Sequence, residues 1–186
     1  MWNKYLIVTF LLIASNCFAQ KNFKFQSKGD YLNYINKKFD ITKSDVFYFN
    51  TNDYSLLIDI NFPMIFVRGN KMITPQNMAK KEGINTRPKK FFTTLSKTRI
   101  LNALEVNNDL SPTILKSIET DIVYDFSEQL TALFIFSHQM GQLGLKFYKY
   151  KEDLEKLDVK CIILTLDEAE IKGISTKNSI QVNKKW

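Results

Sequence analysis

Two strongly apolar runs in the last third of the chain place the tightest constraint on its fold. Residues 132–136 (ALFIF) form the first run and residues 159–166 (VKCIILTL) form the second. Runs of this kind are typical of strands that are covered on both faces. Residues 139–157 between them carry lysine and glutamate on the outer side of a helical pattern, which predicts one long helix. Strand, helix and strand in this order predict a parallel crossover within an α/β fold.

The first half of the chain predicts a further helix and a further buried strand. Tyr31, Ile35 and Phe39 follow one another at four-residue intervals, which predicts a helix over residues 30–39 with one apolar face. Residues 46–49 (VFYF) are rich in the aromatic and β-branched side chains that favour strands. We therefore expect a buried strand there.

The other elements follow from turn signals and shorter patterns. We expect a short helix at residues 53–60 that ends before Pro63, then a strand at 64–67 and a tight turn at 68–71. Residues 75–99 should form a short helix followed by a loop. Ser111 and Pro112 should open a helix that runs through Ile118, and residues 179–182 should add an edge strand. Together these elements predict one α/β domain at residues 20–186, with a mostly parallel sheet flanked by helices.

The first residues of the chain have the three parts of a cleavable secretory signal. Lys4 precedes an apolar run at residues 5–14, and Ala19 supplies a small residue at the cut. The prediction is a signal peptide at residues 1–19 and export to the periplasm or the exterior. The alternative is a lipoprotein anchored through Cys17. No later apolar stretch is long enough to span a bilayer, so no transmembrane segment is expected.

Removal of the signal would leave Cys161 as the only cysteine of the exported chain. One cysteine cannot form an internal disulfide, so the domain must rely on its hydrophobic core. With 45% hydrophobic residues and 15 phenylalanines, the composition argues against a disordered chain.

One segment resembles the active-site region of the thioredoxin family. In that family a buried strand runs into a helix whose first turn carries a Trp-Cys-Gly-Pro-Cys motif. Here residues 134–137 (FIFS) run into residues 139–143 (QMGQL) in a similar way. Met140 and Leu143 occupy the places of the two cysteines, and Gly141 matches the family's glycine.

A second segment, residues 62–71 (FPMIFVRGNK), is similar to the family's proline-led hairpin, with apolar residues and a glycine turn after Pro63. The two segments imply a thioredoxin-like fold. In the family the hairpin follows the cysteine helix, whereas here it precedes it, which implies a permuted, duplicated or analogous arrangement. If Pro63 corresponds to the family's cis-proline, its peptide bond is cis, although a trans proline at a strand start is the commoner case.

The resemblance implies no redox chemistry, because dithiol exchange needs one thiolate to attack and a second thiol to resolve. Neither is present at the expected place. Cys161 lies inside an apolar run, so we expect it to be a buried core residue with a raised pKa.

The candidate binding site is the loop that follows the run at 132–136. His138, the only histidine in the sequence, lies just past that strand, where open α/β sheets place their ligands. Backbone amides at the start of a helix there could hold an anion. The alternative is that His138 only packs. The candidate binding residues are Ser137, His138, Gln139, Met140, Gly141 and Pro63.

No catalytic residue, metal site or cofactor can be assigned from the sequence. There is no Gly-x-Ser-x-Gly elbow, and one histidine and one apolar-strand cysteine do not make a metal cluster. The acidic run at residues 167–170 lacks the spacing of a calcium loop and is interpreted as a solvated turn. An enzyme would have to use His138 with acids that the fold brings near it, as a hydrolase or transferase.

Basic residues gather in the middle of the chain, within a formal net charge of +7. The candidate basic patch comprises Lys80, Lys81, Arg87, Lys89 and Lys90. Such a patch could meet an anionic surface, while a solvated face is the simpler interpretation. Nucleic acid is not expected as a partner of an exported protein.

The function expected from these observations is that of an exported, non-redox, thioredoxin-like protein. It would bind an unidentified protein or small ligand through residues 137–141. The alternatives are the hydrolase or transferase that uses His138, and a basic surface-interaction protein that acts through residues 80–99.

Overall fold

The computed structural model describes residues 24–49, 63–83, 88–105, 115–127, 129–143 and 145–174. The expected signal peptide at 1–19, the helix at 53–60 and the edge strand at 179–182 lie outside the described residues. None of the helices that the structure describes is long and apolar enough to cross a membrane.

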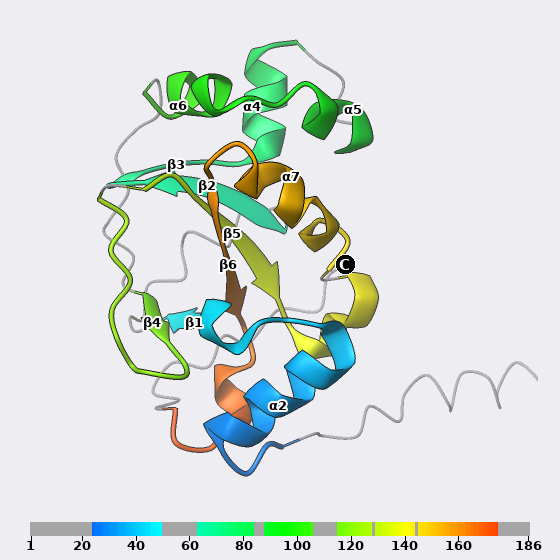
Figure 1. Cartoon of the computed structure of the whole chain (residues 1–186), viewed down its shortest axis with the longest axis vertical. Coiled ribbons are helices and arrows are strands. Elements are labelled where there is room, and N and C mark those ends of the chain that lie inside the picture. Colours follow the sequence, from blue (N-terminus) through cyan, green and yellow to red (C-terminus); the bar gives the residue numbers. More distant parts are fainter. Residues whose placement is uncertain are drawn as a thin grey trace, which may run out of the picture.

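Six strands of the described chain form one sheet with the order β3-β2-β5-β6-β1-β4 (Figure 1). The strands are β1 (Val46–Phe49), β2 (Met64–Arg68), β3 (Lys71–Ile73), β4 (Leu115–Ser117), β5 (Thr131–Phe136) and β6 (Lys160–Thr165). The three central strands β5, β6 and β1 are parallel, and each outer pairing is antiparallel. The α/β class is therefore confirmed. The sheet is mixed rather than mostly parallel.

A short turn makes one of the outer pairs, β2 and β3, antiparallel. Gly69 has φ of +59° in the two-residue turn between β2 and β3, a conformation that glycine adopts without strain. At the other edge, β4 pairs antiparallel with β1, with Phe47 opposite Ser117. The expected helix through Ile118 is wrong, because Leu115–Ser117 extends the sheet edge instead.

The β5–β6 pair confirms the strongest expectation from the sequence. Residues of the two strands pair in parallel along their whole length, from Thr131 with Lys160 to Phe136 with Thr165. The single helix expected between them is wrong. The chain forms the 3-10 segments η2 (His138–Leu143) and η3 (Tyr148–Tyr150), and then the short helix α7 (Lys151–Glu155).

Two features explain why that helix is broken. Gly141 and Gly144 both lower helix propensity within a few residues of each other. Between η2 and η3, Phe147 is buried and packs near the ring of Phe92, so its turn is held by a tertiary contact. Tertiary packing therefore overrides the lysine and glutamate pattern.

Helix α2 (Lys28–Phe39) matches the expected helix. Ser27 caps its first turn by accepting a hydrogen bond from the backbone N–H of Asp30, at 3.1 Å. Its buried residues Tyr31, Leu32, Ile35 and Phe39 form the apolar face that the sequence indicated. This face packs under the sheet and brings Tyr31 to the end of β6.

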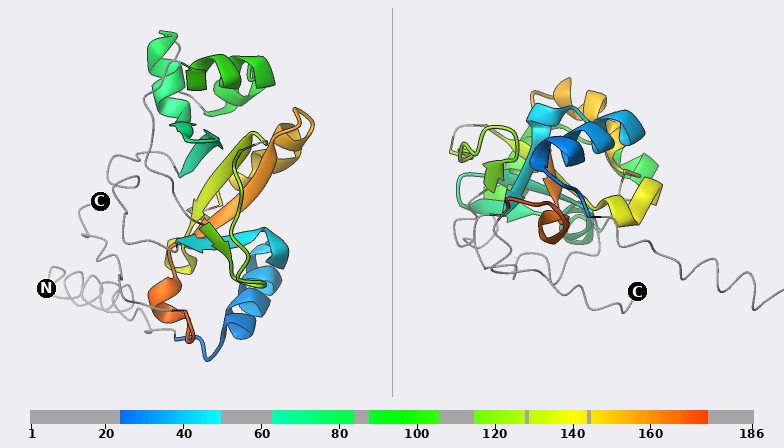
Figure 2. Two further views of the ribbon diagram at one scale, coloured as in Figure 1. Left: turned by 90° about the vertical axis from the view of Figure 1, so that its left-hand side faces the viewer. Right: turned by 90° about the horizontal axis from the view of Figure 1, so that it is seen from below.

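Three helices lie together at one end of the sheet, and α2 lies toward the other end (Figures 1 and 2). They are α4 (Pro75–Lys81), α5 (Pro88–Thr93) and α6 (Lys97–Glu105). A helix after Thr74 was expected, but the loop expected after it is wrong. Phe91, Phe92 and Ile100 are buried there, and their packing makes α5 and α6 part of the core.

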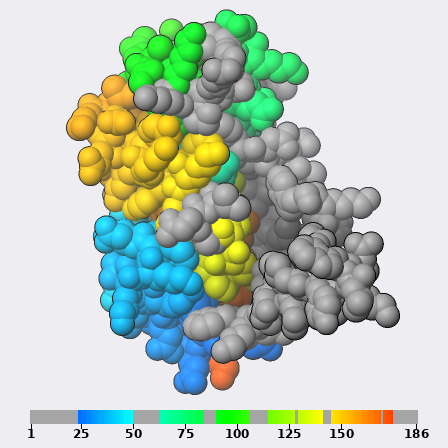
Figure 3. Space-filling view, turned by 90° about the vertical axis from the view of Figure 1, so that its right-hand side faces the viewer, coloured from blue at the N-terminus to red at the C-terminus, as the bar shows by residue number. Residues whose placement is uncertain are grey.

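Both faces of the sheet are buried, which accounts for the continuous apolar strands. The helices cover the face that carries Phe134 and Ile163. The opposite face carries Leu133 and Ile162, and Phe126 packs against it. On the surface, the segment from η2 to α7 adjoins α2 (Figure 3). The candidate loop thus lies beside α2, where the ring of Tyr34 packs against His138.

Candidate functional site

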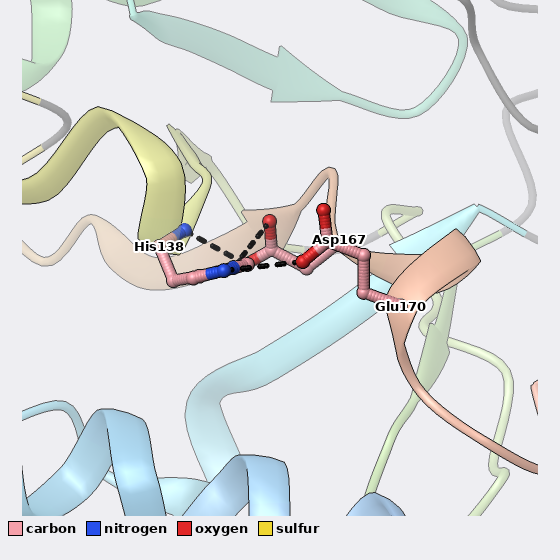
Figure 4. A group of neighbouring side chains, drawn as sticks. All are labelled: His138, Asp167 and Glu170. Carbon is pink, nitrogen blue, oxygen red and sulfur yellow. Dashed lines mark hydrogen bonds and ion pairs between the residues drawn. The ribbon is translucent and has the colours of Figure 1, made fainter. Parts of the chain in front are cut away.

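The parallel pairing of β5 and β6 brings His138 to two acidic residues (Figure 4). His138 begins η2 just after β5, while Asp167 follows β6 and Glu170 ends η4 (Glu168–Glu170). Since the carboxyl ends of adjacent parallel strands meet at one edge of a sheet, residues far apart in sequence become neighbours there.

The imidazole of His138 lies between the two carboxylates. Its Nδ1 is 3.1 Å from Oδ1 of Asp167, and its Nε2 is 3.1 Å from Oε2 of Glu170. The side chain of His138 is 8% exposed and that of Asp167 only 1%, while Glu170 keeps 23%. The cluster is therefore enclosed at Asp167, while Glu170 is partly exposed although its Oε2 is buried.

Asp167 is the centre of a hydrogen-bond network that fixes the loop. Its Oδ1 accepts from the hydroxyl of Ser137 at 2.6 Å, and its Oδ2 accepts from the backbone N–H of His138 at 2.8 Å. The hydroxyl of Tyr31 in α2 donates to the same Oδ2 at 2.9 Å. Thr165 Oγ1 accepts from the backbone N–H of Asp167 at 3.1 Å. Three separate segments of the chain are thereby joined at one carboxylate.

The outer side of the cluster is held by Gln139 and by two aromatic rings. The side-chain amide of Gln139 donates to Oε1 of Glu170, and its backbone N–H donates to the hydroxyl of Ser137. The rings of Phe25 and Tyr34 pack edge-on against the imidazole, with centroids 5.3 and 6.2 Å away. The imidazole is thus fixed in orientation as well as in position.

The surroundings shift the pKa values of the histidine and of its outer partner upward. Burial opposes protonation of His138, but its hydrogen bond to Asp167 and the charges of Asp167 and Glu170 outweigh this, so its pKa rises above 6.5. Burial and the charge of Asp167 raise the pKa of Glu170 above 4.5 in spite of His138. His138 and Glu170 therefore hold their protons more tightly in the folded state than in the unfolded chain.

Glu168, the neighbour of Asp167, is a buried acid that faces another strand. Its Oε1 accepts a hydrogen bond from the backbone N–H of Phe49 at 3.3 Å. Burial raises the pKa of Glu168 to about 7, and this outweighs the hydrogen bonds that favour the charged form. The interpretation of residues 167–170 as a solvated turn is therefore wrong for Asp167 and Glu168.

The raised pKa of Glu168 predicts how stability depends on pH. Because the folded pKa of about 7 exceeds the unfolded value of 4.5, the folded state binds the proton more tightly. We expect the thermal unfolding midpoint to rise as the pH falls from about 8 to about 5, in the presence of a chelator. Glu168→Gln should reduce this rise, whereas Glu152→Gln on the exposed side of α7 should keep it. Identical pH profiles for wild type and Glu168→Gln would contradict the assignment.

The structure brings most of the sequence-predicted site residues together. Ser137 and His138 both contact Asp167, and Gln139 contacts Glu170. Met140 is 40% exposed beside them. Gly141 lies in η2, and the carbonyl of Pro63 accepts from the backbone N–H of Ile135 at 2.9 Å. The bond before Pro63 joins it to Phe62, outside the described residues, so its cis or trans state stays a prediction.

The basic stretch is more heterogeneous than its sequence indicated. Lys80, Lys81 and Lys90 are exposed, on α4 and α5. Nearby Arg99 forms an ion pair with Glu82, and Nζ of Lys97 lies 2.5 Å from Asp158. Lys89 belongs to α5, and Arg87 lies outside the described residues. Acidic partners therefore neutralise part of this stretch.

The geometry does not form a nucleophilic triad. The hydroxyl of Ser137 donates to Asp167 rather than to His138, and both nitrogens of His138 face carboxylates. A serine nucleophile needs the imidazole as its base. Cys161 is buried, as expected, and burial raises its pKa to about 12, so it is not a reactive thiol.

The positions of the acids in the sequence could have predicted that they lie near His138. Asp167 follows β6 just as His138 follows β5, so parallel pairing alone would have placed them together.

No family model matches the chain, and no curated protein or solved structure matches it either.

Proposed function

We propose that this chain is an exported, non-redox, thioredoxin-like protein that binds a partner protein through residues 137–141. Export rests on the signal-like residues 1–19. The absence of redox chemistry rests on Cys161, which is buried and has a raised pKa. It would be the only cysteine left once the signal that contains Cys17 is removed.

The sheet topology supports the thioredoxin-like part of the proposal. The β2–β3 hairpin that follows Pro63 pairs antiparallel with β5, with Met64 opposite Phe134. Pro63 therefore lies beside the end of β5, at the edge from which residues 137–141 extend. The two segments that resemble the family are neighbours in the sheet although the hairpin comes first in the chain. This is the arrangement that a permuted relative would have.

The rigidity of the loop, combined with the exposure of Met140, carries the binding part of the proposal. Asp167 holds the residues that precede Met140, and Glu170 holds Gln139. An apolar side chain exposed on a loop fixed in this way loses little conformational entropy when a partner covers it. Binding is favoured over catalysis because His138 is almost fully enclosed by its partners.

Photocrosslinking in the native host tests this proposal. With a photoreactive phenylalanine in place of Met140, we expect a discrete covalent adduct of the exported chain after irradiation. The same residue at Glu152, exposed on α7, should give none. The adduct should weaken in Ser137→Ala, which removes the hydroxyl that donates to Asp167. No adduct at position 140, or equal adducts at both positions, would refute binding through this loop.

A further inference from the structure

We infer that His138 and Glu170 form a binding site for a divalent transition-metal ion, with Zn²⁺ as the best match. The two ligand atoms, Nε2 and Oε2, lie 3.1 Å apart. Two ligands at zinc's usual bond lengths of about 2.0–2.1 Å in a tetrahedral arrangement are about 3.3 Å apart. A small movement of the partly exposed Glu170 would therefore let both atoms share one ion.

Asp167 lies where the second ring nitrogen of a metal-binding histidine usually finds its hydrogen-bond partner. Metal-binding histidines usually present their second ring nitrogen to a carboxylate, which fixes the ring and increases its basicity. Nδ1 of His138 faces Asp167, and Asp167 is itself held by Ser137, Tyr31 and the backbone N–H of His138. With its oxygens engaged in this way, Asp167 acts as a positioning residue and not as a direct ligand.

The chemistry of the cluster selects the class of ion. One nitrogen of His138 and one oxygen each of Asp167 and Glu170 lie within 4.8 Å of one another. Magnesium and calcium take oxygen ligands, whereas an imidazole with a carboxylate suits zinc and its neighbours. Two carboxylates, Asp167 and Glu170, face the two nitrogens of His138, and a dication would offset their negative charge.

An ion would enter the site by a movement of Glu170, because its Oε2 is buried although the side chain as a whole is partly exposed. Glu170 retains 23% of its side-chain exposure, whereas Asp167 and His138 are nearly enclosed. Two protein ligands leave the remaining coordination positions to water or to a group from a bound molecule. We therefore expect affinity in the micromolar range. The inference concerns the isolated chain and does not depend on a partner at Met140.

Zinc titration of the purified, tag-free chain tests the site. Calorimetry should show one equivalent of Zn²⁺ bound, and the ¹⁵N signal of Nε2 should shift in an NMR spectrum. Because His138 is the only histidine, its imidazole signals need no further assignment. Glu170→Gln, which keeps the side-chain shape, should weaken binding at least about 10-fold. Glu152→Gln, a matched change on the exposed side of α7, should bind zinc like the wild type.

Three results would overturn the inference. They are the absence of zinc binding, a His138 signal that does not move on saturation, and equal affinity in Glu170→Gln. The last two would mean adventitious zinc at the surface. His138→Ala gives a second check, provided that its circular dichroism spectrum matches the wild type. Failure of zinc binding leaves the crosslinking result at Met140 unaffected, so the two proposals can be judged separately.

Discussion

Replacing Asp167 with Ala is expected to lower the free energy of unfolding by about 3–5 kcal/mol, the usual cost of removing one partner from a buried charged network. The side chain is only 1% exposed. Its loss leaves the hydroxyl of Ser137 and the backbone N–H of His138 without their acceptor. The hydroxyl of Tyr31 keeps one partner, Thr165, at 2.5 Å.

Chemical denaturation monitored by circular dichroism measures this loss. Asp153→Ala is the matched control, because Asp153 is an exposed acid on α7 whose ion-pair contact with Lys156 is 3.8 Å long. Its effect should stay within about 0.5 kcal/mol. A loss below about 1 kcal/mol in Asp167→Ala would mean that water replaces the missing oxygens, and that the network does not hold the loop.

The strands were predictable because their burial on both faces is visible in single runs of residues. The run at 132–136 and the paired run at 159–166 became β5 and β6, and residues 46–49 became β1. Helix α2 was predictable because its apolar face repeats every four residues. These are local signals, and local signals are what a single sequence carries.

The errors arose where distant contacts decided the outcome. A lysine- and glutamate-rich pattern indicated a long helix over residues 139–157, but the described chain forms η2, η3 and α7 there, with Phe147 buried between η2 and η3. A loop was expected before Arg99, yet Phe91 and Phe92 enter the core and form helix α5. The sheet is mixed because the β2–β3 hairpin pairs with β5 and β4 pairs with β1, and no local sequence pattern specifies these pairings.

The candidate site was half predictable for the same reason. The position of His138 after a buried strand pointed to the loop that contacts Asp167 and Glu170. The acids at 167–170 were interpreted as solvated, because charged residues usually are. Part of what buries Asp167 is Tyr31, from a helix in the first quarter of the sequence, which donates to it. Such a partner cannot be inferred from the residues around Asp167.

A second large effect is expected where the core meets the loop. Phe136 is the last residue of β5, is fully buried and directly precedes Ser137. Its ring packs edge-on against Phe39 of α2, with centroids 5.2 Å apart. Phe136→Ala should therefore lower the free energy of unfolding by about 3–5 kcal/mol, because it removes apolar burial and leaves a cavity.

The control and the functional consequence separate this effect from that of Asp167. Ile122→Ala removes an apolar side chain that is 67% exposed, and it should change the free energy of unfolding by less than about 0.5 kcal/mol. Phe136→Ala leaves every hydrogen bond of Asp167 chemically possible, so the folded variant should still bind zinc. Asp167→Ala should lose zinc affinity even under conditions where it is folded, because His138 loses its positioning partner. If both variants lose zinc equally while folded, the cluster depends on packing rather than on the carboxylate, and Asp167 has no separate positioning role.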